Sequence, residues 1–252
     1  MGRVQLLRGD VVGALRCAEE LVHDGQDSAD PMVRAWGLFV RGEALSQIGR
    51  LDEAILAVQD SIGLYTAMPD YSGIADSNGL LGQCYLRQGR IGEAMTVLED
   101  SERVIAIHGL RGHQITVPRN ALTEAYLVAA EHSGGAERAA FLERAKRASK
   151  ASLRQGSTFR AGLPHAMRLE GRRAWFEGHP AAARTWWQRG MALAEELEVP
   201  YEIAMSGVDM ARLANEKQHL GRSVDLLAVM GATDDLATAR RLALAASAKD
   251  VA

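Results

Sequence analysis

A glycine followed five residues later by an alanine recurs every forty residues in the first half of this chain. The three copies are Gly9 to Ala14, Gly49 to Ala54 and Gly89 to Ala94. Self-similarity at a fixed period of about 20 to 50 residues is typical of solenoids, whose units pack only on their neighbours. The period therefore predicts a single solenoid over residues 1–252 rather than a conventional globular core.

The segments between the repeated glycines have helical periodicity. Apolar residues recur every three or four positions, as at Val33, Trp36 and Val40, and no segment alternates as a strand would. The chain is therefore expected to be all-α, with about six antiparallel helical hairpins. These hairpins are expected at approximately 2–25 (incomplete), 31–67, 71–108, 114–155, 160–197 and 200–231, with a capping helix at 233–248.

The spacing of small residues within each hairpin resembles the tetratricopeptide repeat. The matching sets are Gly82, Tyr85, Gly89 and Ala94; Gly42, Leu45, Gly49 and Ala54; and Gly171, Ala174, Gly178 and Ala183. The resemblance implies a right-handed superhelix in which small residues let the helices of a hairpin cross closely. The forty-residue units also resemble the C-terminal repeat regions of large bacterial ATPase-containing signalling proteins of the adenylate cyclase or helix-turn-helix regulator type. That likeness implies a fragment of a cytoplasmic signalling protein.

The residues that carry enzyme chemistry do not form a recognisable set. None of the seven histidines pairs with another His or Cys at metal-ligand spacing on one helix, and no nucleophile elbow or phosphate-binding loop is present. We therefore predict no catalytic residue, cofactor or metal. Cys17 and Cys84 fall in different repeats, which argues against a disulfide and favours a reducing compartment. No apolar run is long enough for a membrane span.

The concave side of the solenoid is the expected binding surface, because the first helix of each hairpin lines it. His165, Arg168, Arg172 and Trp175 follow one another at steps of three, four and three residues on one such helix. Two arginines one turn apart could clamp a carboxylate or phosphate. Alternatively, these arginines pair with Glu124 or Glu170, and Trp175 belongs to the core.

Further residues are expected in the same groove, and they pass from acidic and aromatic to basic along it. They are Trp36, Phe39, Glu43, Asp76, Gln83, Asn120 and Glu124. The expected partner is a peptide, another protein or another domain of the parent chain. Self-association through the incomplete first repeat is a further possibility. The alternative function is a sensor domain for a small anionic effector.

A basic segment follows the regular repeats. Residues 136–173 carry ten basic and three acidic residues, and Lys146, Lys150 and Arg154 form a ridge on one helix face. Nucleic-acid binding would need such a ridge. The chain as a whole is acidic, with a net charge of −3, and contains no recognised nucleic-acid module. A solvated helix face is therefore the preferred interpretation.

Overall fold

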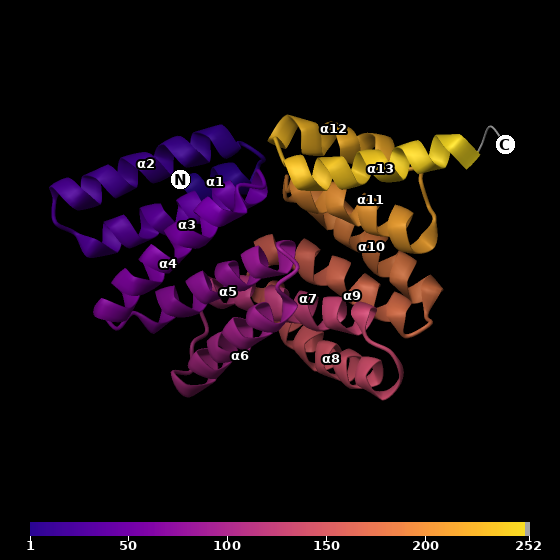
Figure 1. Cartoon of the computed structure of the whole chain (residues 1–252), viewed down its shortest axis with the longest axis horizontal. Coiled ribbons are helices and arrows are strands. Elements are labelled where there is room, and N and C mark those ends of the chain that lie inside the picture. The colour runs from indigo at the N-terminus through magenta and orange to yellow at the C-terminus, as the bar shows by residue number, and fades with distance from the viewer. Residues whose placement is uncertain (250–252) are drawn as a thin grey trace.

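The protein is an array of antiparallel α-helices, and no strand occurs in the part of the chain that is described. The computed structural model describes residues 1–249. The predicted all-α solenoid is confirmed (Figure 1). The helices are α1 (Gly2–Leu7), α2 (Val11–Asp27), α3 (Pro31–Gln47), α4 (Leu51–Ala67), α5 (Tyr71–Arg87), α6 (Ile91–Ile107), α7 (Thr116–His132), α8 (Gly135–Thr158), α9 (Leu163–Phe176), α10 (Pro180–Glu196), α11 (Pro200–Ala214), α12 (Leu220–Met230) and α13 (Thr233–Lys249), with short 3-10 turns η1 (His113–Ile115) and η2 (Arg160–Gly162).

The first half has a strict register. Each helix from α2 to α6 has 17 residues, and three residues separate each of these helices from the next one up to α6. Asp30 and Asp70 begin α3 and α5 by accepting hydrogen bonds from backbone N–H groups of the first turn. Gly49 and Gly89 adopt left-handed φ values of +83° and +75°, which end the preceding helix.

The glycines in the middle of the odd-numbered helices mark close helix crossings. A Cβ added at Gly42 would lie 2.4 Å from Val58, and one at Gly82 would lie 2.4 Å from Leu98. A Cβ at Gly171 would lie 2.4 Å from the indole of Trp187. The predicted steric role of these glycines is therefore confirmed.

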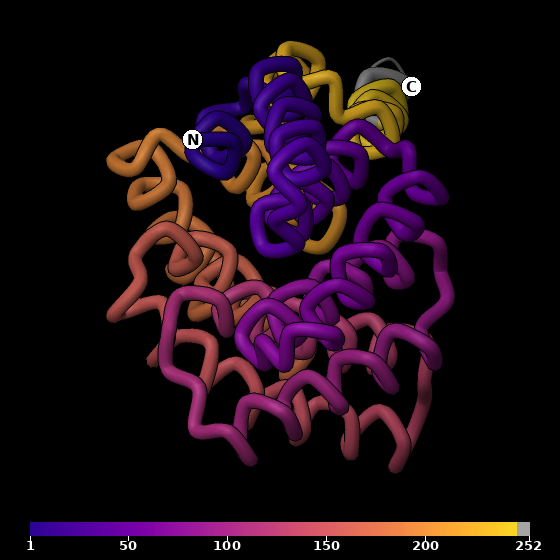
Figure 2. Tube along the Cα trace, turned by 90° about the vertical axis from the view of Figure 1, so that its left-hand side faces the viewer, coloured from indigo at the N-terminus to yellow at the C-terminus, as the bar shows by residue number. Residues whose placement is uncertain are grey.

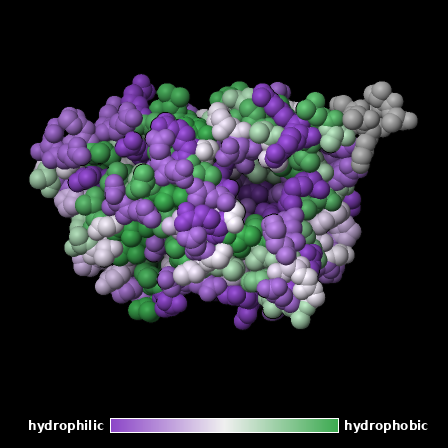
Figure 3. All heavy atoms as spheres, viewed as in Figure 1, coloured by the Kyte–Doolittle hydropathy of each residue, from purple (hydrophilic) through white to green (hydrophobic). Residues whose placement is uncertain are grey.

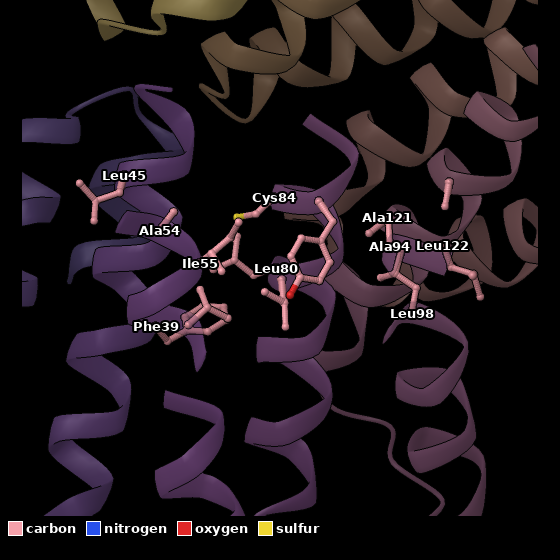
Figure 4. Close-up of a cluster of buried hydrophobic side chains, with 14 of the residues drawn as sticks. Phe39, Leu45, Ala54, Ile55, Leu80, Cys84, Ala94, Leu98, Ala121 and Leu122 are labelled. Carbon is pink, nitrogen blue, oxygen red and sulfur yellow. The ribbon is translucent and has the colours of Figure 1, made fainter. Parts of the chain in front are cut away.

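One hydrophobic cluster runs from α1 to α9 and is built largely from small residues. Ala54 and Ala94, the repeated alanines, are completely buried, and Leu98 and Leu80 fill the spaces between hairpins (Figure 4). Successive odd-numbered helices also contact one another, which bends the array with those helices on its inner side. The inner side is therefore the surface that the first helices of the hairpins share.

The solenoid closes on itself, because α11 to α13 reach the N-terminal hairpins. Thr233 Oγ1 donates a hydrogen bond to the carbonyl oxygen of Ile48 at 2.7 Å. Arg87, at the end of α5, donates a hydrogen bond to Asp235 of α13 at 2.9 Å. Figures 1 and 2 show the indigo and yellow ends of the chain side by side. We call these contacts between the α3–α5 region and α11–α13 the closure seam.

The N-terminal end is partly covered by the chain itself. The short helix α1 packs on α2, and Leu6 and Val11 are buried. Val12, on the outer side of α2, remains 79% exposed. The N-terminal helices therefore bury part of their apolar surface, while Val4, Leu7 and Val12 remain exposed.

Candidate functional site

The closed solenoid surrounds a central cavity of about 500 Å³. Its walls come from α1, α3, α5, α7, α9 and α11, and residues outside these helices also contribute, namely His113, Phe159, Ala161, Gly162, Val199 and Asp235. One face of the molecule shows a hydrophilic hollow near its centre (Figure 3). The volume lies within the range of about 300 to 1,000 Å³ that is usual for ligand sites.

Most of the predicted groove residues meet at this cavity. Six of the eleven line it, namely Glu43, Gln83, Asn120, Glu124, His165 and Arg168. Phe39, Asp76 and Arg172 contact lining side chains instead. The first helices of the hairpins thus bring together residues from different repeats.

The two predicted tryptophans do not line the cavity. Trp36 is 53% exposed. Trp175 packs beside the fully buried Trp187, with ring centroids 6.0 Å apart, in the core between α9, α10 and α11. The alternative interpretation of Trp175 as a core residue therefore fits its position.

At one end of the cavity a single arginine serves two carboxylates. Arg3 Nη1 donates to Asp76 Oδ2 at 3.0 Å, and Arg3 Nε lies 3.2 Å from Glu43 Oε2. Burial raises the pKa of Asp76 to about 7, because the attraction of Arg3 only partly offsets it and Glu43 adds repulsion. We call Arg3, Glu43 and Asp76 the Arg3 cluster.

Where α9 packs between α7 and α11, two buried arginines are held by carboxylates of these neighbouring helices. Arg168 donates to Glu202 at 2.8 Å and to Asp209 at 3.0 Å. Arg172 donates to Glu124 at 3.1 Å and lies 3.5 Å from Glu131. Both guanidinium groups are therefore engaged by their own chain, which argues against a free clamp for an anion.

The pKa of Glu124 is set by the charged side chains around it. Burial alone would raise the pKa of Glu124, but His165, Arg168 and Arg172 together hold it well below its usual range. His165 lies 3.7 Å from both Glu124 and Glu202, so it adds a cation when protonated. The Glu124 carboxylate therefore remains ionised at neutral pH.

Several lining residues were missed by sequence reasoning. Arg87 donates to Asp235, and Tyr201 also donates to Asp235, at 2.9 Å in each case. Glu202 lies on the first helix of the last hairpin, so extending the groove pattern to residues 200–214 would have found it. Asp235 had no such signal, because it reaches the cavity only through the closure seam.

Two deeply buried oxygen atoms at the cavity lack hydrogen-bond donors. Asn120 is 3% exposed and gives its amide N–H to the carbonyl oxygen of Gly162 at 3.1 Å, but its Oδ1 accepts nothing from the described residues. Asp76 is 5% exposed, and its Oδ1 is also unpaired within residues 1–249. Buried polar atoms are nearly always hydrogen-bonded, so the Oδ1 atom of Asn120, which lines the cavity, marks a position where a ligand could donate. Asp76 lies behind the wall, where it contacts the lining residue Arg3.

The described residues hold no cluster of three or more metal-ligating side chains. Both cysteines are free thiols, and burial raises the pKa of the Cys84 thiol, which disfavours the reactive thiolate. The ridge formed by Lys146, Lys150 and Arg154 lies exposed on α8. In residues 1–249 no helix is long and apolar enough to cross a membrane.

Comparison with known proteins identifies the fold. The tetratricopeptide repeat family matches residues 79–100 and 164–189. The Rap protein complexed with Competence and Sporulation Factor superposes with a TM-score of 0.68 at 12% identity, over 94% of this chain and 63% of that chain. This chain thus spans less than two thirds of that Rap protein.

Two further structures agree. The apo form of RapI gives a TM-score of 0.62 at 10% identity over 96% of this chain and 95% of that chain. TTC0263, a thermophilic tetratricopeptide repeat protein of Thermus thermophilus, gives 0.56 at 19% identity over 84% of this chain and 98% of that chain. None of the curated proteins matches by sequence.

Proposed function

Because this chain has a tetratricopeptide-repeat fold, that of a protein-interaction scaffold, we propose that it is a non-catalytic module that binds a short peptide segment of a partner in its central cavity. The observation that carries the proposal is the cavity itself. Side chains from every odd-numbered helix up to α11 converge on a volume of about 500 Å³. The buried Oδ1 atom of Asn120, a lining residue, is left for an incoming donor.

Two considerations support a peptide. The cavity combines apolar residues such as Leu80 and Val117 with polar ones such as Gln83 and Asn120, which suits a chain with mixed side chains and a polar backbone. A Rap protein of the same fold is known in complex with Competence and Sporulation Factor. The likeness to large bacterial signalling proteins further suggests a cytoplasmic regulatory role within a longer parent chain.

A small-molecule sensor is the second candidate, because the cavity volume also suits a compact effector. An anionic effector is the less favourable version. The three arginines that line the cavity, Arg3, Arg87 and Arg168, already pair with carboxylates of the chain.

A thermal-shift experiment can test both candidates. The chain would be melted with pools of blocked random pentapeptides and, separately, with pools of small metabolites. A ligand at a hundred times its Kd adds about 2.7 kcal/mol to stability, which corresponds to a rise in Tm of about 5 to 10 °C for a chain of this size.

Matched variants assign any shift to the cavity. Val117→Trp would fill the cavity from the partly buried Val117 side chain on α7 and should abolish the shift. Leu56→Trp adds the same bulk at an exposed site on α4 and should preserve it. An unchanged shift in the Val117→Trp variant would contradict binding in the cavity.

A further inference from the structure

The residues that line the cavity include more carboxylates than arginines. Among the lining residues there are three arginines, Arg3, Arg87 and Arg168, and four carboxylates. The carboxylates are Glu43, Glu124, Glu202 and Asp235. Asp76 and Asp209 lie behind the wall, each paired with a lining arginine. The site is therefore short of positive charge.

The carboxylates around Arg168 lie among several cations of the chain. There Arg168, Arg172 and Arg212 face Glu124, Glu131, Glu202 and Asp209. The ring nitrogens of His165 also lie 3.7 Å from Glu124 and from Glu202. Every carboxylate in this group therefore has an arginine of the chain within ion-pair distance.

Around Arg3, the described residues supply fewer cations. Arg3 is shared between Glu43 and Asp76, so one carboxylate lacks a counter-charge of its own. The lining histidine near Arg3 is His113, and burial together with Arg3 lowers its pKa, which disfavours a positive charge there. Asp76 Oδ1 and Glu43 Oε2 receive no hydrogen bond from the described residues, so donors are missing here as well as charge.

We infer that the Arg3 cluster is a subsite for a positively charged nitrogen of the bound ligand. This inference rests on the proposed peptide-binding function, so we assign the nitrogen to a lysine or arginine side chain of the peptide. An ammonium or guanidinium group supplies both the missing charge and several N–H donors. A charge-assisted hydrogen bond to a carboxylate is also stronger than a neutral one. The subsite therefore makes the module selective for basic peptides.

The test uses three pools of acetylated and amidated pentapeptides that differ only in a fixed central Lys, Gln or Glu. Blocking the termini removes the terminal charges, and a fourth pool with a free N-terminus and central Gln shows whether a terminal ammonium can serve instead. We expect the Lys pool to raise Tm most, the Gln pool less and the Glu pool least. Individual peptides from the Lys pool would then be measured by calorimetry.

A variant of the subsite completes the test. Glu43→Gln removes one carboxylate but keeps the hydrogen bond from Arg3 to Asp76, so the fold should persist. We expect affinity for the selected Lys peptides to fall about tenfold, while affinity for Gln peptides stays within about twofold. Glu53→Gln removes an exposed carboxylate of the neighbouring helix α4 and should change neither affinity.

The outcomes separate the two proposals. Binding of peptides without a preference for Lys, or with a preference for Glu, would overturn the cation subsite and leave the proposed function standing. The same holds if Glu43→Gln leaves Lys-peptide affinity unchanged. Failure of every peptide pool would overturn both.

Discussion

The two halves of the solenoid achieve the same architecture by different means. From α2 to α6 the helices have equal lengths, and their buried polar groups are serines apart from Asp76. From α7 to α13 the helix lengths vary between 11 and 24 residues. The inner helices α9 and α11 bury Arg168, Arg172, Glu202 and Asp209. Repeated apolar contacts are sufficient to build the first half, so the fold itself does not require buried ion pairs. We attribute the buried ion pairs of the second half to the cavity that they surround.

The largest expected effect is the loss of a central ion pair. Arg168→Met would remove the guanidinium that donates to both buried carboxylates, Glu202 and Asp209, and breaking such a pair typically costs about 3 to 5 kcal/mol. Urea unfolding followed by tryptophan fluorescence measures the loss. Arg50→Met, in an exposed pair on α4, should cost less than about 1 kcal/mol. Equal losses in the two variants would remove the distinction between the halves.

Asp76 is the exception in the regular half, and its titration tests whether it belongs functionally to the charged half. Its pKa of about 7 in the folded protein lies above that of an unfolded aspartate. Between about pH 4 and pH 7 the folded state therefore binds the additional proton, and stability falls as pH rises. Asp76→Asn should remove up to about 4 kcal/mol of that fall. A pH series of urea titrations on both proteins checks this, and parallel curves would contradict it.

In the first half, stability should depend on the packing of buried apolar side chains rather than on charge. Leu98→Ala removes a completely buried side chain that packs at Gly82 and should cost about 3 kcal/mol. Leu56→Ala, at a position that is 63% exposed, should change stability by less than about 0.5 kcal/mol. The same urea assay applies, and a loss at Leu98 below about 1 kcal/mol would show that this half repacks easily.

The smallest expected loss of stability is at the closure seam, where the two halves meet. Arg87→Ala removes hydrogen bonds to Asp235 and Tyr201 and should cost about 1 kcal/mol of global stability. Amide hydrogen exchange should nevertheless become faster in residues 47–50 and 230–235. Unchanged exchange there would show that closure does not depend on this pair.

The sequence was sufficient for features that depend on neighbouring repeats. The small residues Gly42, Gly82 and Gly171 lie where their spacing places a helix crossing. The partners of the arginines depend instead on how the hairpins rotate along the array. Glu170, one predicted partner, pairs with Arg173 on its own helix, whereas Arg168 reaches Glu202 in the next hairpin. The closure seam depends on the sum of all these rotations, so no local pattern could indicate it.

Closure also has a consequence for the order in which this protein acquires its structure during synthesis. A solenoid with only nearest-neighbour contacts can fold one hairpin after another as the chain is made. Ile48, however, is bound by Thr233, which is added 185 positions later. The helices of the first half can therefore form long before the cavity has its last wall. A nascent chain would be helical well before it could hold a ligand.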